Sequence, residues 1–329
     1  MQACFESVLI LIERKNYEKY RATILTRKGL LLFFKLSRPF FLLAGALFYA
    51  LGIGIARYLG HDIDWQLYLL GQLWVTALQL STHYLNEYFD IEGDAANSNR
   101  TAFTGGSGSL GDGEGQLPPS VALLAAASML TAVALATYGL AWQDLLNPSL
   151  SILMVIAFLG AFFYSVPPLR LSSSGFGELV ASILLANIVP AFAFVLQTGE
   201  IHRLLAMSTF PLTALSMAAM LAFEFPDYAS DLKFEKRTLL VRLDWQQGML
   251  VHNLFMISAY LLMAIAFSFG LPGAIALPTF LTLPLGLLQI WYLRRISDGI
   301  KPNWNALTLN AVAIVALSTY LLTYSFWTR

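Results

Sequence analysis

Residues 204–231 read LLAMSTFPLTALSMAAMLAFEFPDYASD and combine the two features on which the fold depends. The first part, 204–223, contains no charged residue. It is long enough to span a bilayer, because a helix needs about 20 mostly apolar residues to cross ~30 Å of hydrocarbon. The last part contains Asp227 and Asp231, one helical turn apart. The stretch therefore predicts a membrane-spanning helix with an acidic pair at its polar end.

The rest of the chain repeats this apolar pattern. Of its 329 residues, 57% are hydrophobic and 12% are charged, against roughly 25% charged residues in an ordinary soluble domain. We therefore expect an all-α integral membrane bundle of nine transmembrane helices in residues 38–329, preceded by an N-terminal cytoplasmic or interfacial segment, residues 1–37. The expected spans are 39–56, 65–85, 119–140, 150–165, 175–196, 204–223, 249–270, 273–293 and 306–326.

Lys and Arg indicate the orientation of the chain, because both concentrate in cytoplasmic loops. With the N-terminus inside, only Arg57, Arg203 and Arg329 of the 20 basic residues fall outside. The long connections 86–118 and 225–247 then lie on the cytoplasmic side, and functional residues are often found on such loops. We expect a multi-pass protein of the cell (inner) membrane with a cytoplasmic active face. The net charge of zero provides no basic field for nucleic acid, so we expect no nucleic-acid partner.

The first candidate site follows the second apolar run, where residues 86–94 read NEYFDIEGD. Successive residues of a helix turn by about 100°, so Asn86, Asp90 and Asp94 share one face. Ionised carboxylates one turn apart repel each other, and charges near lipid are costly. A cation would remove this conflict, and Mg²⁺ is typically held by one or two carboxylates together with substrate phosphates. The cluster predicts a Mg²⁺ site, and a solvated acidic helix end is the alternative when it is taken alone.

The second candidate site is the pair Asp227 and Asp231, which is followed at once by Lys233, Lys236 and Arg237. Two acidic pairs on separate helices can each hold a metal ion, and two metal ions can clamp the oxygens of a diphosphate. The basic side chains would neutralise its remaining charge. An ordinary positively charged cytoplasmic loop is the alternative for each basic residue.

Two further segments offer polar groups to the same face. Residues 104–115 read TGGSGSLGDGEG. Their small side chains let backbone amides turn toward an anion or let a lid move, and a plain flexible loop is the alternative. At the end of the fourth apolar run, Tyr164 is expected to donate a hydrogen bond and Arg170 to pair with phosphate, unless Arg170 is a simple interface anchor.

With these motifs, the chain resembles the intramembrane aromatic prenyltransferases of the UbiA superfamily. Members of that family carry N-x-x-x-D-x-x-x-D after the second helix and D-x-x-x-D after the sixth, and both patterns stand at those places here. The Gly-rich loop and the run KRTLLVRL at 236–243 are most similar to the branch that prenylates 1,4-dihydroxy-2-naphthoate on the route to menaquinone. Residues 224–227 read EFPD where that branch often has Asn-Asn-x-Arg-Asp.

The resemblance implies Mg²⁺-dependent transfer of a polyprenyl group from an allylic polyprenyl diphosphate to an aromatic acceptor. That acceptor would be 1,4-dihydroxy-2-naphthoate or a related quinone precursor, with 4-hydroxybenzoate and homogentisate as alternatives. In this reading, Tyr164 and the four aspartates are catalytic, and the same aspartates and Asn86 hold Mg²⁺. The expected metal ligands are Asn86, Asp90, Asp94, Asp227 and Asp231. The expected substrate-binding residues are Asn86, Arg170, Lys233, Lys236 and Arg237.

A cation-coupled secondary transporter is the alternative from another class. Intramembrane carboxylates also mark ion paths, and two similar motifs hint at an internal repeat. Transporter sites favour the bilayer midplane, however, whereas both acidic clusters here are expected at helix ends on one side of the lipid bilayer. A non-catalytic lipid-binding scaffold, a further alternative, would not need two metal sites.

Overall fold

The structure is a computed structural model that describes residues 26–111, 113 and 115–329. All regular elements within these residues are helical, apart from an isolated bridge between Leu110 and Leu117. The predicted all-α class is therefore confirmed for the described part of the chain. The elements are α3 (Arg27–Leu36), α4 (Pro39–Tyr58), α5 (Trp65–Phe89), α6 (Ile91–Ala96), α7 (Pro119–Trp142), α8 (Pro148–Phe162), η1 (Leu171–Ser173), α9 (Gly177–Ile183), η2 (Leu184–Ile188), α10 (Val189–Thr198), α11 (Arg203–Lys233), α12 (Leu239–Leu243), α13 (Trp245–Ser268), α14 (Gly273–Ala276), η3 (Leu277–Thr282), α15 (Leu283–Ser297) and α16 (Trp304–Trp327).

Seven helical stretches are long and apolar enough to cross a membrane, by length and composition. They account for seven of the nine predicted spans: 39–58, 119–142, 177–198, 203–233, 245–268, 273–297 and 304–327. The other two predicted spans are α5 and α8. Helix α8 has 15 residues, about 22 Å at 1.5 Å per residue, which is shorter than a ~30 Å hydrocarbon core. Helix α5 is longer, with 25 residues, but it carries polar side chains such as Gln79, His83 and Glu87. The count of nine spans stays a prediction.

The predicted N-terminal segment, 1–37, is described only from residue 26 onward. Its described part contains α3, in which Leu30, Leu31 and Phe34 are exposed. Residues 1–25 lie outside the described residues, so the predicted boundary between the segment and the bundle is not tested.

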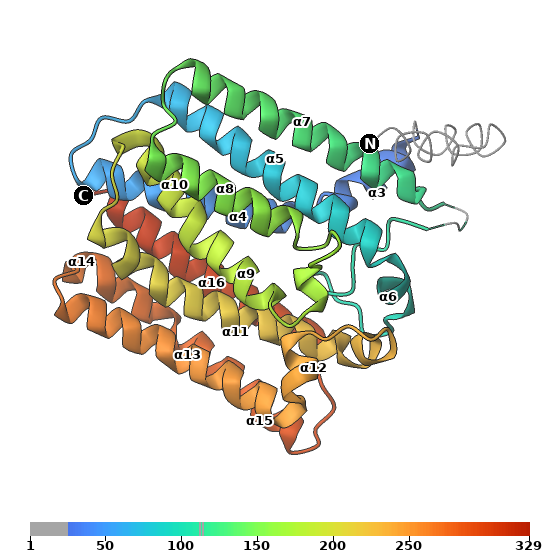
Figure 1. Ribbon diagram of the computed structural model, residues 1–329. Helices are drawn as coiled ribbons and strands as arrows, with labels where there is room; N and C mark the ends of the chain where they lie inside the picture. Colours follow the sequence, from blue (N-terminus) through green and yellow to red (C-terminus); the bar gives the residue numbers. More distant parts are fainter. Residues whose placement is uncertain (1–25, 112, 114) are drawn as a thin grey trace.

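Helix α11 runs through the middle of the bundle (Figure 1). Helices α13 and α15 lie on one side of it, and α5, α7 and α8 lie on the other. Helix α7 packs along α5, and α16 packs against both α4 and α11. The short helices α6 and α12 lie at one end of the bundle, whereas the C-terminus lies at the other. Segments far apart in the sequence therefore meet at the α6 end.

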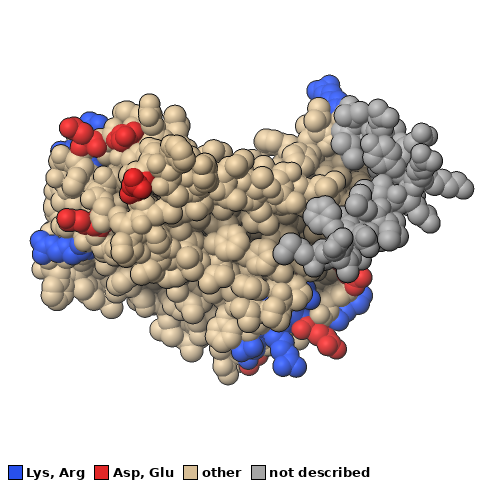
Figure 2. Space-filling view, turned by 45° about the horizontal axis from the view of Figure 1, so that its top comes forward, with Lys and Arg blue, Asp and Glu red and all other residues tan. Residues whose placement is uncertain are grey.

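The outer surface has the charge distribution of a protein embedded in lipid. In the face that Figure 2 shows, Lys, Arg, Asp and Glu gather toward the two ends and a broad uncharged band separates them. On α13, the side chains of Leu250, Leu254, Ile257 and Leu261 are 54–60% exposed. Their spacing places them on one face of the helix, so this row faces away from the bundle. Such a continuous apolar surface is expected to contact lipid.

Close packing between α4 and α10 depends on Gly52. A Cβ atom at this position would collide with the carbonyl oxygen of Pro190 at the start of α10. Pro190 follows η2, a π-helical segment, and has no N–H to donate to the preceding turn. Wide turns of this kind accommodate a missing backbone hydrogen bond inside a helix. The glycine thus allows the start of α10 to lie directly against α4.

We expect Gly52→Ala to destabilise the bundle, because the added methyl group meets backbone that cannot rotate away, and overpacking costs about 1–3 kcal/mol. Gly139→Ala in α7 is the matched control. There the nearest atom to a new Cβ is a Leu70 side-chain carbon at 3.7 Å, and alanine favours helix. Thermal unfolding in one detergent would compare the two variants. A melting temperature of Gly52→Ala equal to or above that of Gly139→Ala would contradict this packing.

Candidate active site

A cavity of about 290 Å³ lies inside the bundle and reaches residues of its α6 end. Its walls come from α4, α5, α6, α8, η1, α9, η2, α10 and α11, together with the loop before α7 and the segment after α11. Asp90, directly after α5, lines the polar part of the cavity, and Trp74 on α5, about four turns earlier, lines the apolar part. The cavity wall includes all five predicted metal ligands: Asn86, Asp90, Asp94, Asp227 and Asp231.

The first motif is divided between two helices. It was expected on one continuous helix, but α5 ends at Phe89, and Asp90 leaves helical geometry with ψ 8° before α6 begins. Aspartate favours helix ends because its side chain competes with the backbone for hydrogen bonds. The amide of Asp94 still donates to the carbonyl oxygen of Asp90 over 2.9 Å. One turn of helical spacing is thereby kept across the break, and all three motif side chains reach the same cavity.

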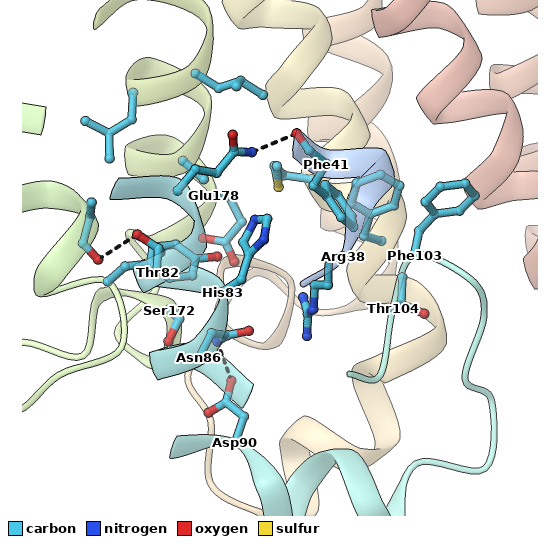
Figure 3. A pocket seen from close by; sticks show the side chains of 18 of the residues that line it. Arg38, Phe41, Thr82, His83, Asn86, Asp90, Phe103, Thr104, Ser172 and Glu178 are labelled. Atoms are coloured by element: carbon cyan, nitrogen blue, oxygen red, sulfur yellow. Dashed lines mark hydrogen bonds between the residues drawn. The ribbon is translucent and has the colours of Figure 1, made fainter. Parts of the chain in front are cut away.

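The carboxylate of Asp90 is the centre of this motif. Asn86 donates a hydrogen bond from Nδ2 to Asp90 Oδ2 over 2.9 Å, as Figure 3 shows. Asp90 Oδ1 is buried and accepts no hydrogen bond, although the guanidinium of Arg170 lies 3.6 Å away. Burial raises the pKa of the nearby Asp94 carboxyl to about 7, despite the opposing charges of Arg38 and Lys236. A further cation at this point would favour the ionised form.

The two acidic motifs converge on Lys236. Its Nζ lies 2.8 Å from Asp90 Oδ2 and 4.0 Å from Asp231 Oδ1. Burial lowers the pKa of Lys236, but the carboxylates of Asp90 and Asp231 outweigh burial and raise it. The ammonium group therefore stays charged and joins the end of α5 to α11.

Asp227 anchors the Gly-rich loop. Its Oδ1 accepts a hydrogen bond from Asn97 Nδ2 over 2.6 Å, and its Oδ2 accepts one from the amide of Gly105 over 3.2 Å. The next residue, Gly106, has φ +69°, and a Cβ there would collide with the carboxylate of Asp94. Only glycine combines this backbone conformation with so close an approach. The loop thus lies directly against both motifs.

A second anchor for the loop is Glu87, whose side chain is buried. Its Oε1 accepts a hydrogen bond from Arg38 Nε over 2.8 Å and another from the amide of Ser107 over 2.7 Å. Its Oε2 accepts one from Ser107 Oγ over 2.8 Å. One carboxylate therefore connects the start of α4, the end of α5 and the Gly-rich loop.

The remaining predicted residues separate into two groups. Tyr164 lines the cavity from the turn after α8. Burial raises the pKa of Tyr164, and the neighbouring acidic groups add to the effect, so its hydroxyl stays protonated and able to donate. Lys236 also lines the cavity, and Arg170 lies beside Asp90 without being part of the wall. Lys233 and Arg237 are exposed and do not line the cavity.

The donor set of the two motifs fits Mg²⁺. Carboxylate and amide oxygens are the ligands that this ion prefers, and the buried Asp90 Oδ1 has no hydrogen-bond donor of its own. In the described part of the chain, no group of three or more His, Cys, Asp and Glu side chains is close enough to hold a metal by itself. Mg²⁺ usually draws its other ligands from water and substrate phosphates. The site therefore fits an ion that arrives with a diphosphate.

Several polar residues of the site were not singled out from the sequence, among them Glu87, Asn97, Glu178 and Glu224. Glu87 and Asn97 flank the first motif, and Glu224 lies three residues before Asp227 on α11, so helical periodicity was sufficient to find them. Glu178 lies on α9, far from both motifs along the chain, and no spacing in the sequence connects it to them.

The model of the UbiA prenyltransferase family matches residues 46–313 of the chain. The chain belongs to the UbiA prenyltransferase family. It is therefore a prenyltransferase, and with its apolar helices it is a multi-pass membrane protein. The resemblance inferred from the two motifs is confirmed.

Individual UbiA relatives show the same relationship. The chain is 26% identical over 207 residues to a 1,4-dihydroxy-2-naphthoate octaprenyltransferase of Bacillus subtilis (strain 168), a match that covers 63% of this chain and 64% of that enzyme. A solved UbiA homologue from Archaeoglobus fulgidus bound to GPP and Mg²⁺ superimposes with a TM-score of 0.61 at 16% identity, covering 88% of this chain and 99% of that one. A solved digeranylgeranylglyceryl phosphate synthase gives 0.60 at 14% identity, covering 92% and 98%. These two structures establish a common fold.

We expect Glu87→Gln to loosen the Gly-rich loop, because the substitution leaves Arg38 without its carboxylate and replaces one of the two oxygens that hold Ser107. Hydrogen bonds to charged groups contribute about 1.5–3 kcal/mol, so amide hydrogen exchange at 105–109 should accelerate about tenfold or more. Glu92→Gln, an exposed carboxylate on α6, is the matched control. Unchanged exchange in Glu87→Gln would show that this carboxylate does not hold the loop.

Proposed function

We propose that this UbiA enzyme transfers a polyprenyl group from an allylic polyprenyl diphosphate to 1,4-dihydroxy-2-naphthoate in a Mg²⁺-dependent reaction. The observation that carries the proposal is the convergence of two acidic motifs on one ammonium group, with Lys236 Nζ 2.8 Å from Asp90 and 4.0 Å from Asp231. The acceptor is inferred from the Bacillus subtilis relative and from the similarity of the Gly-rich loop and 236–243 to that branch. 4-Hydroxybenzoate and homogentisate are the alternative acceptors.

The proposed reaction exchanges one bond for another. The bond between C1 of the prenyl group and the diphosphate oxygen breaks, and its electron pair leaves with pyrophosphate. A carbon–carbon bond then forms between C1 and the ring, which loses a proton or CO₂ from the attacked carbon. The residues proposed to hold Mg²⁺ are Asn86, Asp90, Asp94, Asp227 and Asp231. Mg²⁺, when bound, neutralises the charge that develops on the departing pyrophosphate.

The protein's own groups add to this stabilisation. Lys236 donates to the pyrophosphate from the point where both motifs meet, and Tyr164 donates a hydrogen bond from the cavity wall. The guanidinium of Arg170 lies 3.6 Å from Asp90 Oδ1, so it can also pair with an oxygen of the pyrophosphate. Lys233 and Arg237 stay predicted substrate-binding residues, and their exposed side chains restrict them to the mouth of the site.

The apolar part of the cavity suits the prenyl chain. The rings of Trp74 and Phe192 stack there with centroids 4.9 Å apart, and both line the cavity together with Leu78 and Leu185. An allylic cation is quenched by water, so a dry wall protects it, and aromatic faces stabilise positive charge. We therefore place the diphosphate among the aspartates and the prenyl chain along α5 toward Trp74.

We also propose that the α6 end of the bundle faces the cytoplasm. Arg38, Lys236 and Arg242 lie near this end, and Lys and Arg concentrate on the cytoplasmic side of membrane proteins. In the cell membrane, a soluble acceptor and Mg²⁺ then reach the site from the cytoplasm.

Asp90→Asn and Asp231→Asn should each reduce prenyl transfer by about a hundred- to a thousandfold, since each removes a charge that assists the leaving pyrophosphate. The assay uses labelled farnesyl or geranylgeranyl diphosphate, Mg²⁺ and a panel of aromatic acceptors, with EDTA to remove the metal. Asp62→Asn, an exposed carboxylate at the other end of the bundle, is the matched control and should keep full activity. Both site variants should stay folded at the assay temperature, with a lowered melting temperature because each loses an ion pair of Lys236.

Three results would refute the proposal. The first is retained Mg²⁺-dependent transfer in both site variants. The second is transfer that continues in EDTA. The third is ion flux in liposomes without any prenyl transfer, which would instead indicate a transporter.

Single cysteines would test the orientation. In a background where Cys4, the one cysteine of the chain, is replaced by serine, Lys301→Cys lies in the loop after α15 and His61→Cys in the loop after α4; both positions are exposed. A membrane-impermeant maleimide should label His61→Cys in right-side-out vesicles and Lys301→Cys in inside-out vesicles. The reverse pattern would place the active site outside the cytoplasm.

A further inference from the structure

A buried carboxylate oxygen in the cavity wall has no part in the proposed diphosphate site. Glu178, on α9, is 3% exposed, and its Oε2 has no hydrogen-bond partner. A buried acceptor without a donor is costly, so such an atom calls for an explanation. In Figure 3, Glu178 and Ser172 lie on one side of the cavity, opposite Arg38 and Phe103. Ser172 Oγ is likewise buried without a partner.

The structure explains only part of this acidic group. Glu178 Oε1 accepts a hydrogen bond from the amide of Leu239 over 2.7 Å, and Glu224 Oε2 accepts one from the amide of Leu240 over 3.1 Å. The two carboxyl groups thus hold the first amides of α12, and their side chains share a hydrogen bond with each other. Holding α12 uses one oxygen of Glu178. No N–H or hydroxyl group donates to Oε2, and Glu178 lines the cavity, so this oxygen can accept a hydrogen bond from a bound molecule.

The charge of the pair restricts what can bind to it. A diphosphate finds no cation beside this hydrogen-bonded acidic pair, whereas the Asp90–Lys236 region offers it one. A neutral hydroxyl group, by contrast, donates a hydrogen bond to a carboxylate oxygen with favourable energy. The acceptor of a prenyl group is an electron-rich aromatic ring that carries such a hydroxyl.

We propose that Glu178 Oε2 accepts a hydrogen bond from a hydroxyl group of the aromatic acceptor and thereby orients its ring toward the prenyl C1. The inference rests on the proposed function for the identity of the acceptor. The hydrogen bond also increases electron density on the ring, because it draws the hydroxyl proton toward the carboxylate. Ser172 Oγ lies on the same side of the cavity as a further polar group for the acceptor.

Glu178→Gln separates this role from the structural one. The glutamine keeps an oxygen for the amide of Leu239, so α12 stays in place, but it replaces the free acceptor oxygen with an NH₂ donor. The experiment measures equilibrium binding of 1,4-dihydroxy-2-naphthoate and of its two monomethyl ethers. The full-length protein is kept in detergent with Mg²⁺ and unreactive farnesyl thiodiphosphate. Glu200→Gln, an exposed carboxylate before α11, is the matched control.

We expect the unsubstituted protein to prefer the dihydroxy compound over one of its ethers by about ten- to a hundredfold. Glu178→Gln should remove most of that preference while its affinity for the farnesyl analogue and its melting temperature stay unchanged. Glu178→Asp keeps the charge and should retain part of the preference. Glu200→Gln should behave as the unsubstituted protein does.

Three outcomes overturn the inference. Equal hydroxyl preference in Glu178→Gln and the unsubstituted protein would leave this residue with the structural role alone. A changed Mg²⁺ requirement for binding the farnesyl analogue would assign Glu178 to the metal instead. Failure of the unsubstituted protein to bind the dihydroxy compound would also refute it. Failure of the proposed function appears separately, as absence of product in the transfer assay, and leaves the binding comparison valid.

Discussion

The ion pairs of Lys236 hold together the parts of the chain that build the site. Asp90 ends α5, Asp231 belongs to α11, and the ammonium group between them is within 4.0 Å of both carboxylates. Buried charges are tolerated only when they are paired. Two acidic motifs at one end of an apolar bundle would otherwise repel each other and separate the helices that carry them. The position of α6, the end of α11 and the segment before α12 all depend on this compensation.

The Gly-rich loop follows from the same constraint. Once the acidic groups are gathered, their remaining oxygens need donors, and an extended loop of small residues can bring backbone amides close to them. Gly105 donates to Asp227, Ser107 donates to Glu87, and Gly106 passes so close to Asp94 that no side chain fits. The loop is thus part of the polar structure of the site. Its sequence looked equally compatible with a flexible linker because composition does not reveal which carboxylates its amides meet.

The sequence was sufficient for the features that repeat along a single helix. Apolar length predicted the helix that became α11, and four-residue spacing predicted that Asp227 and Asp231 would line one cavity. The sequence did not predict features that depend on contacts between two distant segments. The break of α5 at Asp90 arises because the following residues turn toward α11. Of the basic residues after α11, only Lys236 lines the cavity. The amide of Arg237 donates a hydrogen bond to the carbonyl oxygen of Ser173, and its side chain is exposed. Glu178 could not be predicted as a site residue, because tertiary packing alone brings α9 to α12.

The cavity separates two kinds of chemistry by charge. Around Lys236 the acidic groups are compensated by cations, so the proposed diphosphate and Mg²⁺ would bind there. Around Glu178 and Glu224 the carboxyl groups are compensated by the amides of α12, which satisfy one oxygen of each and supply no full positive charge. A polyanion finds no cation in this second region, whereas a hydroxyl group can donate a hydrogen bond there. Tyr164 is near groups of both regions, Glu178 and Glu224 on the one hand and Asp90 on the other. A donor diphosphate and a hydroxylated ring would therefore take different sides of one cavity without competing for the same groups, and the bond between them would form beside Tyr164.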